Sequence, residues 1–169
     1  IGSVNTITTG DNTTSAYHNK IFGRNNSIST SGSNAYAIYN YISGIGNVIT
    51  NGLYNNILGV SNNITASGTN VAYNNIIGYG NNVTATYTNA HHHQIIGNNN
   101  TVDSGESVKI LGSYCNNGGY TGVMLLSDGG TSTLTATAHH EFNARFNGGY
   151  RFMKDGSTQW MAIANTGYV

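Results

Sequence analysis

The chain has 169 residues and a formal net charge of zero at pH 7, and only 7% of its residues are charged. Proteins that bind nucleic acid or an anionic membrane surface need clustered Lys and Arg, so we expect neither kind of partner. The sequence contains 23 Gly, 27 Asn and no Pro, and it keeps no apolar 3.6-residue period. It therefore predicts neither helices nor a membrane-spanning segment.

A recurring pair, an apolar residue followed by Gly or Ser, marks the first two-thirds of the chain. Successive pairs begin 21, 20, 16, 19, 19 and 15 residues apart. The pairs are Ile1-Gly2, Phe22-Gly23, Ile42-Ser43, Leu58-Gly59, Ile77-Gly78, Ile96-Gly97 and Leu111-Gly112. Six of them are followed, five residues after the Gly or Ser, by Ile7, Ile28, Val48, Ile64, Val83 or Val102. A fixed motif with a variable period predicts a solenoid whose turns carry loops of different length.

Each repeat holds two short β-suited segments separated by a turn, most clearly in 55–66 and 74–85. Gly and Asn accept left-handed backbone conformations, so the Gly and Asn-Asn positions are predicted to be corners. The third repeat departs from this pattern, because Ser43 stands where Gly is expected and Gly44 follows it. The register of the repeat stays open at Ser43.

The apolar residue of each pair is expected to point inward. Asp in place of Ile77 or Ile96 would then bury an unpaired charge and prevent folding, whereas Asp at Asn70 should be tolerated. About three inward side chains per repeat contribute roughly 1.5 to 3 kcal/mol each, whereas ordering about 17 residues costs about 1 to 2 kcal/mol apiece. Because one repeat cannot offset that cost, we predict a parallel homotrimer whose chains pack in register.

The repeat pattern stops near Asn116, so we divide the chain into a solenoid (1–118) and a small β-rich module (119–169). In the second part, 150–153 and 158–163 are predicted strands joined by an Asp155-Gly156 hairpin turn. The predicted core of this module is Phe142, Phe146 and Phe152, with Trp160 as the alternative. The chain opens inside the repeat motif and shows no signal peptide, so we expect either a processed chain or a segment of a longer fibre.

Two stretches resemble known fibre proteins. The Ile-Ile-Gly-x-x-Asn-Asn-Val-x-Ala pattern of 76–85 resembles the head repeats of YadA-like trimeric adhesins, a resemblance that covers about residues 1–115. It implies an all-β fold, a left-handed parallel β-roll or β-solenoid in a trimeric fibre. Residues 141–152 look like a segment that recurs in phage tail fibres, which implies a β-rich, intertwined C-terminal module. The repeats here are longer and richer in Asn than the usual adhesin repeat, and within these 169 residues we expect neither an autotransporter anchor nor a self-cleaving C-terminal domain.

The sequence offers little basis for an enzyme. Among its six acidic residues, only Asp103 and Glu106 are close in sequence, and in a Ser-Gly loop they are better explained as solvated turn residues than as paired catalytic carboxylates. No Ser lies in a Gly-x-Ser-x-Gly elbow, and Gly78-x-Gly80 lacks the strand-to-helix setting of a phosphate loop. Cys115 is expected to be a small buried side chain.

Histidines form the one unusual chemical feature, the run His91-His92-His93. In an extended strand His91 and His93 point to the same side, and around a three-fold axis they would supply six imidazoles, which suit Zn, Ni or Fe. Such an arrangement resembles the iron-holding His-x-His rings of trimeric long tail fibres. The alternative is a polar surface loop without a cofactor, and we favour that interpretation, also for His139-His140.

Two functions stay open on the sequence alone. The first is a non-enzymatic fibre segment of a phage or phage-like particle, located in the virion and supporting host attachment, with other fibre or tail proteins and a host surface glycan or protein as partners. The second is a bacterial trimeric adhesin head on the cell surface. Ice binding ranks below both, because Thr residues such as Thr65 and Thr84 are too few per face.

Tyr54, Tyr73 and Tyr87 are candidate glycan contacts, because tyrosines in a nearly uncharged chain suit stacking on sugars and these three lie near loops. We favour their alternative role, a ladder that packs against neighbouring turns or neighbouring chains.

Overall fold

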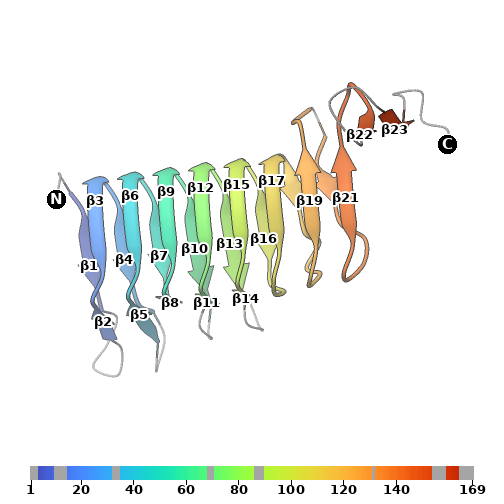
Figure 1. The fold of residues 1–169 in the computed structure, drawn as a ribbon. Helices are drawn as coiled ribbons and strands as arrows, with labels where there is room; N and C mark the ends of the chain where they lie inside the picture. Colours follow the sequence, from blue (N-terminus) through green and yellow to red (C-terminus); the bar gives the residue numbers. More distant parts are fainter. Residues whose placement is uncertain are drawn as a thin grey trace.

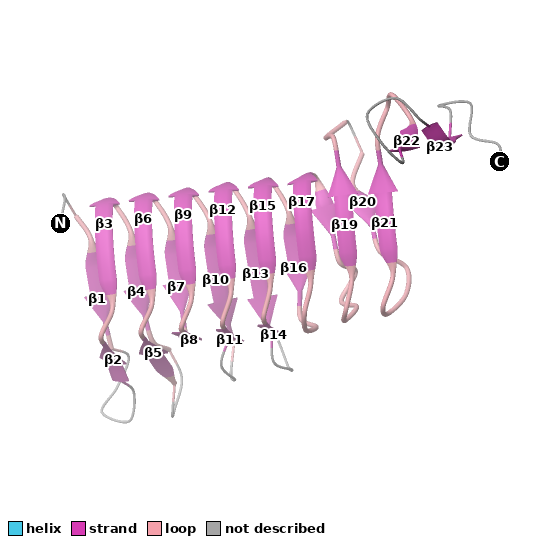
Figure 2. Cartoon of the chain, viewed as in Figure 1, coloured by secondary structure: helices cyan, strands magenta, loops and turns pink. Residues whose placement is uncertain are grey.

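The structure, a computed structural model, describes residues 4–9, 15–31, 35–67, 71–85, 90–130, 132–153 and 159–163. Figure 2 shows that the described chain consists of strands and loops alone. No described helix could span a membrane. Tyr87 and Asn70 lie outside the described residues.

Successive turns of the chain stack along one axis, as Figure 1 shows, and their strands form three parallel sheets that run along this axis. Sheet A contains β1 (Thr6–Thr8), β4 (Ser27–Ser29), β7 (Val48–Thr50), β10 (Asn63–Ala66), β13 (Asn82–Ala85), β16 (Thr101–Asp103), β18 (Cys115–Asn116) and β20 (Leu134–Thr135). Sheet B contains β2 (Ser15–Tyr17), β5 (Tyr36–Ile38), β8 (Gly52–Leu53), β11 (Val71–Ala72) and β14 (Ala90–His91). Sheet C contains β3 (Lys20–Arg24), β6 (Tyr41–Ile45), β9 (Asn56–Val60), β12 (Asn75–Tyr79), β15 (Gln94–Asn98), β17 (Lys109–Ser113), β19 (Met124–Ser127) and β21 (Phe142–Arg145).

Equivalent residues of successive repeats lie directly beside each other in this stack. In sheet C, for example, Ile76 pairs with Ile57 on one side and Ile95 on the other. The predicted all-β repeat fold, a parallel β-solenoid, is confirmed. The register at the third repeat is also settled: Ser43 pairs with Leu58 and Gly44 with Gly59. The third repeat is therefore shifted by one residue from the predicted alignment, and Ile49, not Val48, is its inward residue.

Ile and Val side chains fill the interior between the sheets. Sheet C contributes one buried row, namely Ile21, Ile42, Ile57, Ile76, Ile95, Ile110 and Leu125. Sheet A contributes another, namely Ile28, Ile49, Ile64, Val83 and Val102.

The prediction that Ile77 and Ile96 point inward is wrong. Side chains alternate between the two faces of a strand, and in β12 and β15 it is Ile76 and Ile95 that are fully buried. Ile77 is half-buried and Ile96 is 45% exposed. The residue before Gly thus lies on the outer face of sheet C, so Asp at Ile77 or Ile96 buries no charge within a single chain.

A buried row of asparagines joins the turns at one corner of the solenoid. Asn62 illustrates it: its backbone N–H and its Nδ2 both donate to Oδ1 of Asn47, at 3.0 Å each, and its Nδ2 also donates to the carbonyl of Gly78 at 2.9 Å. Asn26, Asn47, Asn81 and Asn100 make the same pattern. A second row, Asn19, Asn40, Asn55 and Asn74, runs along another corner. These amides satisfy buried backbone groups where the chain leaves the sheets.

Glycines after the outer apolar residues allow the turns to stack closely. Gly78 has φ of +137°, and a Cβ built on it would lie 1.8 Å from the carbonyl oxygen of Gly97. No other residue can occupy such a position without moving the neighbouring turn. This close approach, and not a corner, explains the Gly of the repeat. The left-handed corner residue precedes the buried Asn instead, as in Ser61 and Gly80.

The solenoid continues beyond residue 118. Strand β19 pairs in parallel with β17, and β21 pairs in parallel with β19. The stack therefore does not end at the predicted boundary, 118/119, but continues to Arg145. In β19 the Gly of the repeat is replaced by Ser127, which pairs with Gly112. The antiparallel pairing of β22 (Tyr150–Met153) with β23 (Gln159–Ile163) confirms the two predicted strands, whereas the predicted Asp155-Gly156 turn lies outside the described residues.

Two of the predicted core aromatic residues of this end are exposed. Phe142 lies on the outer face of sheet C beside Met124, and Phe146 contacts Tyr150 edge to face. The alternation that buries Leu125 places its neighbours outward, so neither Phe142 nor Phe146 fills the interior of a single chain. The side chains of Phe152 and Trp160 lie outside the described part of the structure.

Candidate functional site

The outer face of sheet C carries a row of apolar side chains, called the apolar row. We use this name for Phe22, Leu58, Ile77, Ile96, Leu111 and Leu126, which take the same position in successive strands and are interrupted by Ser43. Phe22, Ile96 and Leu111 are exposed, and the other three are half-buried. Because exposed apolar side chains do not improve solubility, a row of them on one face calls for another explanation. Contiguous exposed apolar patches commonly mark interaction sites.

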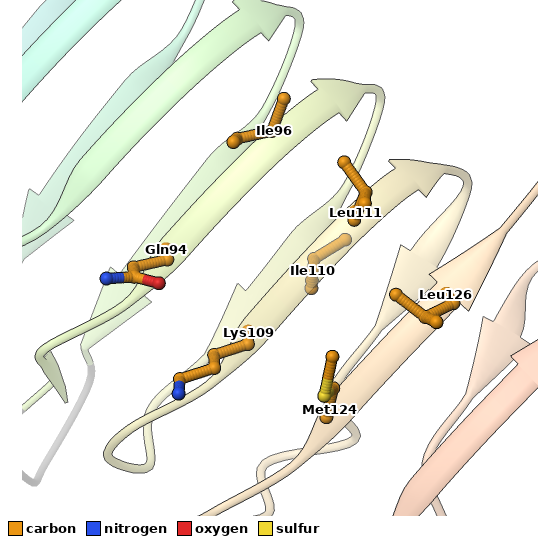
Figure 3. A pocket seen from close by; sticks show the side chains of 7 residues that line it. All are labelled: Gln94, Ile96, Lys109, Ile110, Leu111, Met124 and Leu126. Carbon is orange, nitrogen blue, oxygen red and sulfur yellow. The ribbon is translucent and has the colours of Figure 1, made fainter.

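A groove of about 200 Å³ lies beside this row at β15, β17 and β19. Figure 3 shows Ile96, Leu111 and Leu126 on one side of it and Gln94, Lys109 and Met124 on the other, with Ile110 at its base. The strands of sheet C contain Lys20, Arg24, Lys109 and Arg145 but no Asp or Glu. The groove therefore offers apolar contact and one ammonium group, and it has no pair of groups suited to acid–base catalysis.

The outer face of sheet A is polar by contrast. One of its two outward rows consists of hydroxyl residues in five successive turns, namely Thr8, Ser29, Thr50, Thr65 and Thr84. Several hydroxyls bond within the face, as Ser29 does to Thr50 at 3.3 Å. The row is longer than we expected from Thr65 and Thr84 alone, and the parallel row beside it includes Val48 and Asn63.

A column of stacked rings runs along the corner between sheets B and C. It consists of His18, Tyr39, Tyr54, Tyr73 and His92, whose centroids are 4.8 to 5.2 Å apart with interplanar angles of 2 to 11°. All five residues have positive φ, between 54 and 60°. We call this set the aromatic column.

The candidate glycan contacts Tyr54 and Tyr73 belong to the aromatic column. Both faces of each ring are occupied, because Tyr54 lies between Tyr39 and Tyr73, and Tyr73 lies between Tyr54 and His92. A sugar therefore meets only their edges and hydroxyls. The alternative role, a ladder between turns, describes their position, and glycan contact stays a prediction.

The histidine run does not form the extended segment on which the metal hypothesis depends. His92 has φ of +60° and turns the chain between its neighbours. His91 ends β14, whereas His93 is fully buried and takes the place of the next Asn in the second row. Its N–H donates to Oδ1 of Asn74 at 3.0 Å, and its Nδ1 accepts from the N–H of Val108 at 3.2 Å.

His93 is held in its neutral form. Burial, together with the nearby His91 and His92, lowers its pKa from 6.5 to about 4. Among the described residues, neither Nε2 of His93 nor Nδ1 of His91 has a hydrogen-bond partner. Within the described residues, no three His, Cys, Asp or Glu side chains lie close enough to hold a metal together. The surface-loop alternative fits His92, which is exposed, but not His93.

Other residues singled out in the sequence lie where expected. Asp103 and Glu106 are both exposed, as expected, although Asp103 ends strand β16 and only Glu106 lies in the loop that follows. Cys115 is buried at the end of the first Asn row, where its N–H donates to Oδ1 of Asn100. Burial raises the pKa of its thiol, so the thiol stays protonated and unreactive.

Comparison with protein-family models, curated proteins and solved structures finds no significant match to this chain.

The sequence indicated a ladder for Tyr54 and Tyr73, but it did not predict that His18, Tyr39 and His92 belong to the aromatic column. A signal was present, because His18, Tyr39, Tyr54 and Tyr73 each precede the Asn of the second row, and His92 precedes His93. An aromatic-Asn pair repeated at the period of the turns indicates a stacked position. The apolar row was found, but it was assigned to the wrong face.

Proposed function

We propose that this chain is a non-enzymatic structural segment of a trimeric fibre of a phage or phage-like particle, and that it supports attachment to the host surface. The observation that carries the proposal is the apolar row on the outer face of sheet C. In the fibre this face packs against identical chains, whereas the hydroxyl face of sheet A remains in water.

The size of the face suits such an interface. Eight strands about 4.8 Å apart and five residues of about 3.3 Å each give a flat area of about 550 Å². Stable interfaces bury about 800 Å² of accessible surface per partner, and the accessible area of a face with protruding side chains exceeds its flat area. A contact over the whole face is therefore of the right order.

The spacing of the row favours an identical partner. The side chains of the apolar row repeat at the distance between strands, so only a surface with that same repeat can match every turn. A parallel, in-register copy of the chain has this repeat by construction. The positive groups at Lys20, Lys109 and Arg24 lie in the rows that flank the apolar row, where they can remain solvated.

Sedimentation or multi-angle light scattering of the chain tests the proposal, with a double variant on each face. Ile77→Asp with Leu111→Asp changes the apolar row, and Ser29→Asp with Thr65→Asp is the matched control on sheet A. We expect a trimer for the wild type and the control, and a folded lower-order species for the sheet C variant. A wild type that is a stable folded monomer at micromolar concentration would contradict the proposal.

A bacterial trimeric adhesin head is the second candidate, since the same face would serve its assembly. The flanking sequence distinguishes the two candidates, because a downstream outer-membrane anchor indicates an adhesin and an upstream tail-attachment region indicates a virus.

A further inference from the structure

A groove lined by tyrosines opens on the outer face of sheet B, away from the apolar row. It measures about 330 Å³ and is lined by Tyr17, Tyr36, Ile38, Tyr39, Leu53 and Tyr54. These residues come from β2, β5 and β8 and from the corner that carries the aromatic column. Among the described residues, no charged side chain lines the groove.

The tyrosines at the edge of the groove occupy backbone positions that disfavour them. Tyr39 and Tyr54 have φ of +55° and +54°, a region that costs a bulky side chain energy and that Gly or Asn occupy readily. The equivalent position at the other corner is taken by residues such as Gly46 and Gly80. Ease of turning the chain therefore does not explain these tyrosines, and strain of this kind clusters at functional sites.

The ring geometry leaves two kinds of contact for a ligand. Tyr39 and Tyr54 stack on each other at 5.1 Å and 11°, so they present edges and hydroxyl groups. Tyr36 stacks on none of the described rings, and Tyr17 meets His18 edge to face at 78°. Tyr17 and Tyr36 are both exposed, and they can offer aromatic surface to a ligand, while Ile38 and Leu53 form an apolar base.

From these observations we infer that the groove binds a neutral saccharide. A sugar ring presents a C–H face, which suits aromatic and aliphatic side chains, and hydroxyls at its rim, which suit the donors and acceptors of four phenols. The neutral lining matches an uncharged ligand. An extended peptide would need free main-chain groups, but the strands at the base, β5 and β8, already pair with their neighbours on both sides.

The inference deepens the attachment part of the proposed function, because a fibre that meets a host surface meets glycans first. It is separable from assembly, since the groove lies on sheet B and the apolar row on sheet C. Loss of saccharide binding leaves the trimer intact, and loss of the trimer leaves the groove in place on each chain.

The test is binding of the intact chain to an array of neutral hexose and N-acetylhexosamine oligosaccharides, followed by titration of each hit by NMR. Tyr36→Ser and Tyr17→Ser should each weaken binding at least tenfold, while Tyr36→Phe, which keeps the ring, should weaken it less. Tyr79→Ser and Tyr114→Ser are the matched controls, because both side chains are exposed but lie outside the groove. Circular dichroism checks that each variant keeps its β content.

Three results would overturn the inference. One is the absence of binding by the wild type to every oligosaccharide at millimolar concentration. Another is equal loss of binding in the groove variants and in the controls. The third is binding of a Pro-rich peptide in the groove with no saccharide binding, which would identify a peptide site instead.

Discussion

Replacing His93 with Asn should change how the stability of the protein depends on pH. His93 interrupts the second row of asparagines. Its N–H donates to Asn74 and its Nδ1 accepts from the N–H of Val108, but its Nε2 has no partner among the described residues. Asn at this position restores the side chain that the four preceding turns use, without a group that titrates.

The size of the effect follows from the pKa of His93. In the folded protein this pKa is about 4, against an ordinary value of 6.5. Above pH 6.5 the imidazole is neutral in both states, so it adds no pH dependence. Between 6.5 and 4 the unfolded chain binds a proton that the folded chain does not, so stability falls as the pH falls. At about 1.4 kcal/mol per unit of pKa, the loss reaches about 3 kcal/mol at pH 4.

Urea denaturation at pH 7, 6, 5 and 4.5 measures this effect. The wild type should lose stability progressively below pH 6.5, and His93→Asn should lose about 2.5 kcal/mol less by pH 4.5. His92→Asn is the control, because His92 is exposed and Asn accepts its positive φ. Equal slopes in the wild type and His93→Asn would refute the argument, whatever the stabilities at pH 7, because only the slope reports titration of this side chain.

Three further predictions concern the stacking of turns and the histidines. Gly78→Ala should prevent normal stacking of the turns, because the added Cβ would lie 1.8 Å from the carbonyl oxygen of Gly97. Gly148→Ala is the control, because its Cβ meets nothing within 4 Å. Thermal unfolding followed by circular dichroism should show a lower midpoint for Gly78→Ala and an unchanged one for Gly148→Ala. Asn62→Ala removes the oxygen that accepts from the backbone N–H and the Nδ2 of Asn81. It should lower the free energy of unfolding, measured by urea denaturation, by about 2 to 6 kcal/mol. Asn98→Ala, at an exposed site, should lower it little, and similar losses in both variants would contradict the role of the buried row. Elemental analysis of protein purified without added metal tests the pairing of His91 with His93: a transition metal near one ion per three chains would support it, and because His93 is enclosed we expect none.

The repeat made the class of fold predictable, but not which side of each strand faces inward. A pair such as Ile76-Ile77 contains two apolar residues, and composition alone does not say which of them is buried. The deciding fact is the close approach of Gly78 to Gly97, a relation between turns that no single repeat reveals. The same holds for Asn62 and Asn81, whose value lies in bonding to each other across 19 residues.

The candidate site was less predictable because its parts come from different turns. The groove on sheet B combines Tyr17 with Tyr36 and Leu53, which are distant in sequence. Their proximity depends on the register that pairs Tyr17 with Ile38 and Ile38 with Leu53. In the same way, the extended strand expected for His91 and His93 is interrupted at one residue, because His92 has a positive φ and its ring stacks on that of Tyr73 in the preceding turn.

The two Asn rows make the contact between neighbouring turns independent of the length of the loops. Each Asn bonds to its equivalent one turn away in the same geometry, whether the two residues are 15, 19 or 21 positions apart in the sequence. A turn can therefore be inserted or removed as a unit, because the turns on either side present matching amides and glycines. Duplicating 75–93 should lengthen the particle by one strand spacing, about 4.8 Å, and leave every other contact unchanged. Length could then evolve in discrete steps without any redesign of the cross-section.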